Sequence, residues 1–265
     1  MAATTGGPLA RERNLILALL LVLAAAAWIL LAGRAGVAGE MGMGLTMGMA
    51  APVFLGIWLA MMVAMMFPTA APMILMFARV NATRRERGGA FVPTWIFVAA
   101  YLLIWIAFGG AAYVLATSAE RLAASSMWLM ENAPRVGGLV LVLAGLYQLS
   151  PLKRVCLSKC RSPLQFVVTR WRDGRGGAVR MGLEHGLYCL GCCWLLFVIL
   201  FPLGMMNVAA MALITLLIFA EKSLPLGRQV SLAAAALLIA YGLVVVVVPA
   251  ALPTTMSAPA GTPVA

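Results

Sequence analysis

Charged residues are scarce in this sequence, since Asp, Glu, Lys and Arg together make up 10% of its 265 residues, and it contains a single histidine. Soluble domains have roughly 25% charged residues. The AVILMFWYC class reaches 64%, and the mean hydropathy of +1.02 is too high for a wet surface to cover the chain. These values exclude a single water-soluble globule, a disordered chain and a disulfide-stapled secreted module.

Motifs for energy-driven or hydrolytic chemistry are also missing. We find no ATP-binding loop, no phosphorylation Asp motif and no Ser/His/Asp arrangement. The segments between the apolar runs are too short to form a soluble catalytic domain. We therefore expect a protein that is neither an ATPase nor a hydrolase and that is not an enzyme.

Long apolar runs are what the sequence does contain, and a membrane-spanning helix needs about 20 mainly apolar residues. The runs are continuous rather than alternating, which excludes a membrane barrel. They predict an all-α, polytopic transmembrane helix bundle of six to seven spans, forming one domain over 1–250 with a disordered tail over 251–265. The expected spans are 14–32, 52–78, 91–117, 136–149, about 186–203, 207–220 and 230–250. The segment 186–220 is either two spans or one broken, re-entrant unit.

The basic residues predict the orientation of this bundle. With the N-terminus in the cytoplasm, 16 of the 19 Lys and Arg residues fall in inner segments, and only Arg34, Arg121 and Arg135 fall outside. This bias follows the positive-inside rule. The net charge of +11 therefore indicates orientation and contact with the lipid bilayer, and we expect no nucleic-acid partner.

Methionine is unusually frequent, with 18 residues. Thioether sulfur is a soft ligand that favours Cu(I). The methionines of the first outer loop and of the second span therefore predict copper sites. The alternative is that these methionines serve as adaptable apolar packing. Pro68 and Pro72 remove backbone donors in the second span and should free carbonyl groups for a neighbour. The candidate methionine ligands are Met41, Met43, Met47, Met49, Met62, Met65 and Met66.

All five cysteines lie between residues 156 and 193, on the predicted inner side, where thiols stay reduced. At 100° per residue, one face of the fifth span carries the histidine and three of the cysteines, a set that suits copper and also zinc. Two more thiols precede it at a four-residue spacing, where neighbouring Lys and Arg should lower their pKa values. The candidate inner ligands are His185, Cys189, Cys192, Cys193, Cys156 and Cys160.

Several further side chains are candidates for supporting or gating this chemistry. Glu184 is either an interface carboxylate or a hydrogen-bond partner of His185. Glu221 and Lys222 end the sixth span and could be an ordinary interfacial ion pair. The turn after Leu203 either adds sulfur to the outer site or is a tight hairpin, and it contributes Met206, Asn207 and Met211.

Four sequence blocks resemble a bacterial family of predicted metal-binding integral membrane proteins with a domain of unknown function. The most specific block is Cys189-Leu190-Gly191-Cys192-Cys193-Trp194, and another reads Met61-Met62-Val63-Ala64-Met65-Met66-Phe67-Pro68. The others are Tyr147 to Lys153 with Cys156 and Cys160, and Met205 to Asn207 with Glu221 and Lys222. The resemblance spans about 61–225 and implies a metal-binding protein of the bacterial inner membrane. Copper follows from the sulfur chemistry.

The leading hypothesis is a protein that binds Cu(I) and transports or delivers it across the inner membrane. Outer and mid-membrane methionines would collect the ion, and the inner thiols would hold it. A metallochaperone or a larger membrane complex would be the partner. The alternatives are a non-catalytic subunit or assembly factor of such a complex, and a membrane thiol-disulfide oxidoreductase using Cys189 and Cys192.

Overall fold

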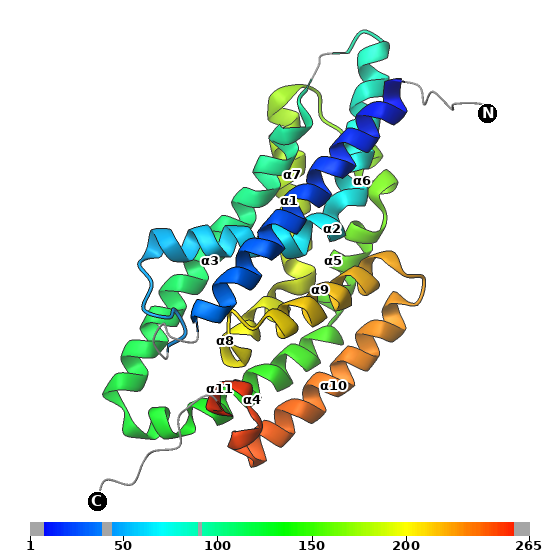
Figure 1. Ribbon diagram of the computed structural model, residues 1–265. Coiled ribbons are helices and arrows are strands. Elements are labelled where there is room, and N and C mark those ends of the chain that lie inside the picture. Colours follow the sequence, from blue (N-terminus) through cyan, green and yellow to red (C-terminus); the bar gives the residue numbers. More distant parts are fainter. Residues whose placement is uncertain (1–7, 39–43, 90–91, 257–265) are drawn as a thin grey trace, which may run out of the picture.

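The computed structural model describes residues 8–38, 44–89 and 92–256, and within them the chain is helical and contains no strand. Figure 1 shows the helices in a bundle, in which the first described helix begins at one end and the last described helix lies at the other. The long and short helices follow one another as α1 (Pro8–Ala38), α2 (Ala51–Glu86), α3 (Thr94–Ser125), α4 (Met127–Gln148), α5 (Pro151–Arg161), α6 (Pro163–Arg170), α7 (Gly174–Val198), α8 (Leu200–Leu203), α9 (Val208–Ser223) and α10 (Gly227–Val247), followed by η1 (Pro249–Ala251) and α11 (Pro253–Met256).

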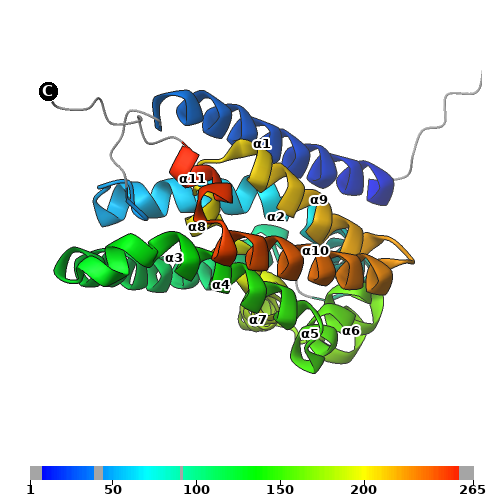
Figure 2. The same ribbon diagram turned by 90° about the horizontal axis from the view of Figure 1, so that it is seen from below.

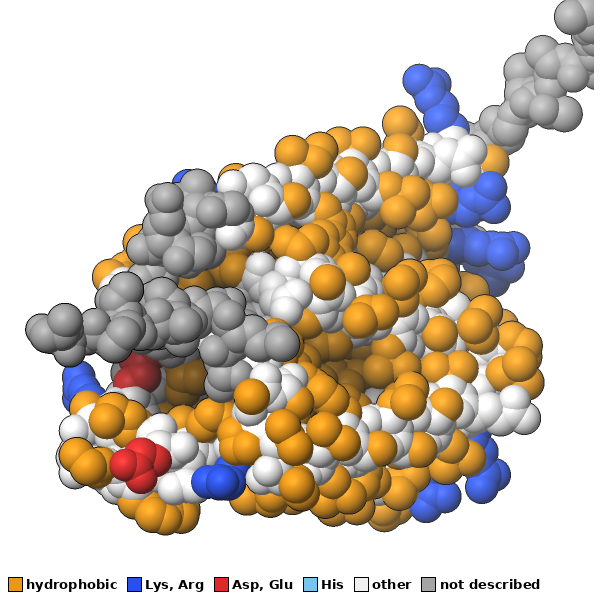
Figure 3. All heavy atoms as spheres, turned by 60° about the horizontal axis from the view of Figure 1, so that its bottom comes forward, with side chains coloured by type: hydrophobic (Ala, Val, Ile, Leu, Met, Phe, Trp, Pro, Cys, Tyr) orange, Lys and Arg blue, Asp and Glu red, His pale blue; other side chains and the backbone are white. Residues whose placement is uncertain are grey.

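Six helical segments among the described residues are long and apolar enough to cross a membrane: α1, α2, α3, α4, α7 continued by α8, and α10. The seventh expected span is α9, which has 16 residues. Large apolar side chains such as Ile29, Leu115 and Leu237 point outward, each at least 70% exposed. Figure 3 shows apolar side chains across the middle of one face and charged ones toward its ends. The all-α polytopic bundle predicted from the sequence is confirmed.

Helix α2 is the most buried of these segments. It packs against α1, α3, α6 and α9, while α4 packs along α10 and α3 along α7. Figure 2, seen from below, shows α5 and α6 beside α7 at one end of the bundle. The inner helices therefore bring residues of α2, α5, α7 and α9 close to one another.

Proline shapes α2 as the sequence predicts. Pro68 has no N–H, so the carbonyl group of Ala64 loses its partner within the helix. The indole Nε1 of Trp28 in α1 donates a hydrogen bond to this carbonyl oxygen at 3.1 Å. An apolar helix with a proline is thereby stabilised by a neighbour rather than by water.

Several predicted boundaries were wrong. The segment 150–185 is not a long loop, because it contains α5 and α6, and α7 begins at Gly174 rather than at 186. Ser150 and Pro151 explain the first of these helices, since the Ser150 hydroxyl accepts a hydrogen bond from Lys153 N at 3.1 Å and proline suits a first helical position. The fourth span begins at Met127 rather than at 136, after Ser126, whose hydroxyl caps it.

The segment 186–220 forms two separate helical units, which turn at Gly204 with a φ of +94°. The first residues of the expected tail belong to the end of η1 and to α11, which reaches Met256. Leu252 is buried, and the Tyr241 hydroxyl donates to the Ala251 carbonyl oxygen at 3.0 Å. Residues 257–265 lie outside the described part of the chain.

Candidate metal site

Four thiols meet where α5 packs against α7. The Cys160 thiol from α5 lies beside those of Cys189 and Cys192 on α7 and interacts with both. The Cys193 thiol also interacts with these two α7 thiols. We call Cys160, Cys189, Cys192 and Cys193 the thiol cluster. All four are free thiols, three of them buried and Cys160 partly exposed, so the structure joins the two cysteine groups that the sequence predicted separately.

A buried cation lies against this cluster. The Lys222 ammonium group, at the end of α9, donates to Cys189 Sγ at 3.1 Å and to Thr69 Oγ1 at 3.3 Å. The Tyr101 hydroxyl from α3 lies 3.2 Å from the same sulfur. The Cys189 sulfur is therefore contacted by polar groups from α3 and α9, inside an apolar bundle.

Glu221 and Lys222 do not form the ordinary ion pair that the sequence suggested. The Glu221 carboxylate instead accepts hydrogen bonds from Lys153 Nζ at 2.7 Å and from Ser231 Oγ at 3.0 Å. All three side chains are buried. Helix α9 thus ends with two adjacent charges directed to different partners, one toward the thiol cluster and one toward α5 and α10.

The methionines of α2 approach the cluster through Thr69. Its hydroxyl donates to the Met66 carbonyl oxygen at 3.0 Å and lies 3.9 Å from Met66 Sδ. Met62, Met65 and Met66 are completely buried. The thioether of Met66 is thereby joined to the Cys189 thiol through two polar side chains, Thr69 and Lys222.

The segment that carries the described outer methionines packs on α3 rather than against this cluster. Met41 and Met43 fall outside the described residues, and Met47 and Met49 are partly buried. Their segment is anchored on α3, where Glu120 accepts from Thr46 N at 2.8 Å and the Tyr113 hydroxyl donates to the Met49 carbonyl oxygen at 3.1 Å. Along α2, the buried rings of Phe54 and Trp58 lie between this segment and Met62.

His185 lies one helical turn before Cys189 and is enclosed by aromatic rings. Its centroid is 5.9 Å from Phe97, 5.4 Å from Tyr101 and 5.7 Å from Phe166. Neither ring nitrogen has a hydrogen-bond partner within the described ranges. Glu184 is not its partner, because that carboxylate pairs with Arg180 at 3.1 Å and with Arg170 at 3.8 Å. Glu184 is therefore an ion-pair partner of two arginines rather than a hydrogen-bond partner of His185.

The predicted lowering of the pKa values in α5 was wrong. Hydrogen bonds to Cys189 and Cys192, together with burial, raise the pKa of Cys160 well above its usual range. Burial, and then the neighbouring Cys192, raises the pKa of Cys156. Both thiols thus remain protonated near neutral pH. The Cys156 side chain faces Gly191, where an added Cβ atom would lie 2.7 Å from its sulfur.

The turn between α8 and α9 favours the hairpin interpretation. Asn207 caps α9, since its side-chain oxygen accepts from Ala210 N at 3.1 Å and its amide donates to the Leu203 carbonyl oxygen at 3.1 Å. Met206 and Met211 are buried against the core. These residues fix the start of α9, whose other end carries Lys222.

Within the described ranges, no three His, Cys, Asp or Glu side chains are placed so that they could hold one metal ion. The reason lies in the direction of the thiols. Cys192 and Cys193 donate to the Cys189 carbonyl oxygen at 3.1 and 2.8 Å. The Cys189 sulfur itself accepts a hydrogen bond from the Lys222 ammonium group. The four sulfurs are adjacent and chemically suited to Cu(I), but these side chains must rotate before they can converge on one ion.

The sequence analysis did not assign Thr69, Tyr101 or Lys153 to the site. Each is a polar residue that the structure places in or beside an apolar helix. Polar groups at membrane depth mark functional sites or buried partners. That signal is present in the sequence, but their partners lie 68 to 153 residues away.

Comparison with known proteins assigns the family. The model of PpoB2, a copper chaperone family, matches residues 55–245. No curated protein and no solved structure matches the chain. The matched range runs from α2 to α10 and so includes the thiol cluster, Lys222 and the methionines of α2. Because the match covers most of its length, the chain belongs to the PpoB2 family of copper chaperones.

Proposed function

We propose that this protein holds Cu(I) at the thiol cluster and exchanges it with the buried methionines of α2, as a copper carrier of the bacterial inner membrane. The ion is its cargo, and the chain catalyses no reaction. The observation that carries the proposal is the series of contacts from Met66 through Thr69 and Lys222 to Cys189. It connects the two sulfur types at the centre of the bundle.

The chemistry of the two sulfur types supports this assignment. Thioethers bind Cu(I) without losing a proton, whereas cysteines bind it as thiolates. The buried ammonium group of Lys222 offsets the negative charge that thiolates bring into an apolar site. Thiolates also bind Cu(I) more tightly than thioethers do, so the gradient of affinity runs from Met66 toward the cluster. Zinc is the alternative cargo for the thiols.

Transport across the membrane and delivery from within it differ in the use of the outer methionines. In the transport mechanism, an ion from Met47 and Met49 passes the rings of Phe54 and Trp58 before it reaches Met62. In the delivery mechanism, a metallochaperone or a membrane complex exchanges copper directly with the thiol cluster. Proteoliposomes loaded with Cu(I) on one side distinguish these mechanisms, because only transport moves the ion to the other side.

The first test is Cu(I) binding by the purified protein under anaerobic conditions, measured by competition with a chromogenic chelator. We expect Cys189→Ser/Cys192→Ser to lose the tight site. Cys156→Ser is the matched control, since this thiol lies against Gly191 on the same helix pair and is not one of the four cluster thiols, and it should retain binding. If the wild-type protein binds no Cu(I), or if the double variant binds it equally well, the proposal is wrong.

The role of the thioethers is tested by the rate of loading. Met66→Leu removes a sulfur next to Thr69 and should slow copper transfer to the thiols while leaving their final occupancy unchanged. Met61→Leu is the control, because Met61 is equally buried in the same helix and the change in volume is the same. Equal rates in both variants would leave the α2 methionines as packing residues.

The oxidoreductase alternative makes a different prediction. It requires a mixed disulfide between a Cys189 or Cys192 variant and a partner protein, which non-reducing electrophoresis would reveal. The assembly-factor alternative requires stable co-purification with a complex whose activity falls without any copper bound to this chain. The copper chaperone family favours copper binding over both.

A further inference from the structure

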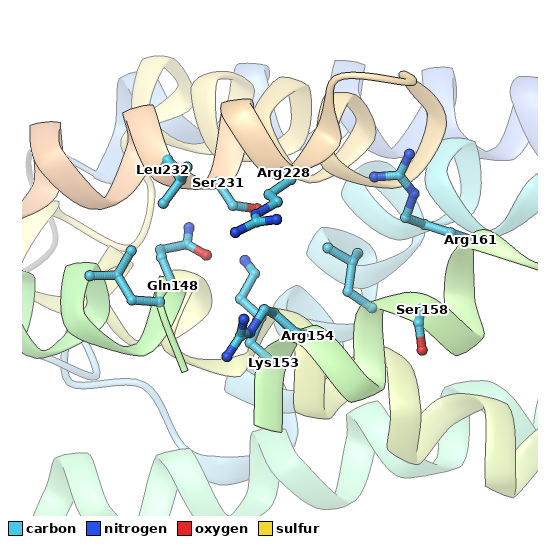
Figure 4. A pocket seen from close by; sticks show the side chains of 10 residues that line it. Gln148, Lys153, Arg154, Ser158, Arg161, Arg228, Ser231 and Leu232 are labelled. Atoms are coloured by element: carbon cyan, nitrogen blue, oxygen red, sulfur yellow. The ribbon is translucent and has the colours of Figure 1, made fainter. Parts of the chain in front are cut away.

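A second candidate site lies between the end of α4, α5 and the start of α10. A cavity of about 230 Å³ opens there. Its walls combine basic side chains with the apolar Leu149, Leu157 and Leu232. Figure 4 shows Gln148, Lys153 and Arg228 directed toward one another from the three helices, with Arg154 beside Lys153.

The charge around this cavity is strongly unbalanced. Lys153 is neutralised by Glu221 at 2.7 Å, and the Glu221 carboxylate is also bound by Ser231. The guanidinium group of Arg161 donates to two backbone carbonyl oxygens, those of Glu221 and Leu224. In the part of the chain that the structure describes, no carboxylate pairs with Arg154, Arg161 or Arg228. Three positive charges therefore surround one cavity.

Gln148 is an independent sign of a ligand. Its side chain is 3% exposed, and neither its amide nitrogen nor its amide oxygen has a partner within the described ranges. An unpaired buried amide costs about 1–3 kcal/mol, so a native protein normally satisfies it. Figure 4 shows the amide directed into the cavity, where it could donate to an oxygen atom of a bound group.

We infer that this cavity binds a phosphate group, held by Arg154 and Arg228 and oriented by the amide of Gln148. Guanidinium groups bind phosphate oxygens through paired, charge-assisted hydrogen bonds. The cavity lies at the end of the bundle that the sequence predicts to face the cytoplasm, where anionic lipids gather and basic pockets between helices hold their head groups. A free phosphate offers the same chemistry, so the experiment must separate the two sources.

The test uses the full-length protein, delipidated in detergent. Native mass spectrometry measures the binding of short-chain phosphatidylglycerol against phosphatidylcholine, and calorimetry measures the binding of inorganic phosphate. We expect Arg154→Gln/Arg228→Gln to weaken the binding of the anionic probe roughly tenfold or more. Gln148→Leu, which keeps the charge, should weaken it as well.

The matched control is Arg79→Gln/Arg175→Gln, which removes the same charge from exposed positions outside the cavity. Retained binding in this control, with loss in the cavity variant, supports the site. Preference for phosphatidylglycerol then assigns a lipid head group, and binding of inorganic phosphate alone assigns a soluble anion. Equal loss in both variants, or no binding of either probe, overturns the inference. Cu(I) binding by the same variants is measured separately, because the inference does not rest on the proposed copper function.

Discussion

Lys153 and Glu221 illustrate how individual charges are managed inside this bundle. They lie 2.7 Å apart with 1% and 2% of their side chains exposed, and Ser231 satisfies the second carboxylate oxygen. In a buried ion pair of this kind each charge neutralises the other, but removal of one partner leaves a buried, uncompensated charge that destabilises the folded state. The pair also joins α5, which carries Cys160, to α9, which carries Lys222.

We predict that Lys153→Met destabilises the protein by about 3–5 kcal/mol, since it leaves the Glu221 carboxylate buried without a cation. The double variant Lys153→Met/Glu221→Gln should recover most of this loss, because it removes both charges. Thermal unfolding in detergent, followed by circular dichroism, measures both. Equal destabilisation of the single and double variants would show that the charges are not energetically coupled.

The raised pKa of Cys160 gives a second residue-scale prediction. Since neighbouring thiols and burial hold its proton, alkylation by iodoacetamide should be slow at pH 7 and should accelerate only as the pH rises above the usual cysteine range. Peptide mapping by mass spectrometry measures the modification of this residue. Cys189→Ala removes one of the hydrogen-bonding neighbours and should move the profile to lower pH. A rate that is already maximal at pH 7 would indicate a thiolate instead.

At the scale of elements, close packing of α2 against α3 depends on a missing side chain. A Cβ atom at Gly109 in α3 would lie 2.4 Å from the Trp58 indole. That ring cannot easily move, because it is buried and its Nε1 donates to the Trp105 carbonyl oxygen at 2.9 Å. Gly109 therefore sets the distance between two helices that surround the site.

We predict that Gly109→Ala lowers the stability by about 1–3 kcal/mol, the usual cost of overpacking. Gly110→Ala is the matched control, since an added Cβ there meets no atom within 4 Å. The control should be neutral or slightly stabilising, because alanine favours a helix over glycine. The midpoint of thermal unfolding in detergent separates the two, and similar midpoints would contradict the role of Gly109.

At the scale of the whole molecule, α1 begins at one end of the bundle and α10 ends at the other (Figure 1). This agrees with an odd number of crossings in which α9 counts as one, although it has only 16 residues. The charge bias predicts that α5 and α6 face the cytoplasm. The thiol cluster lies where α5 meets α7, so it would be reached from that side.

This topology predicts the labelling of single cysteines by an impermeant maleimide in intact cells, in a variant that lacks the five native cysteines. A cysteine in place of Thr254 should react from outside, and one in place of Arg172 should react only after the membrane is opened. Both positions are exposed in the structure, so burial cannot explain a difference. Reaction of Arg172→Cys in intact cells would reverse the orientation.

The sequence by itself determined the class of this molecule and the identity of most of its chemistry. The length of the apolar runs requires helices in a bilayer, the missing N–H of Pro68 requires a donor for Ala64, and sulfur of two kinds predicts a soft metal. These conclusions depend on composition and on contacts within one helix, which spacing along the chain reveals directly.

Only the tertiary structure decided which side chains meet. Spacing placed His185 on one face with the α7 thiols, yet packing enclosed it in aromatic rings and brought Cys160 to the thiols instead. Packing also directed Lys222 to Cys189 and Glu221 to Lys153, although Glu221 and Lys222 are adjacent in sequence. The physical reason is that adjacent residues on a helix point in directions about 100° apart, so the packing of neighbouring helices, rather than proximity in sequence, selects the partner of each buried charge.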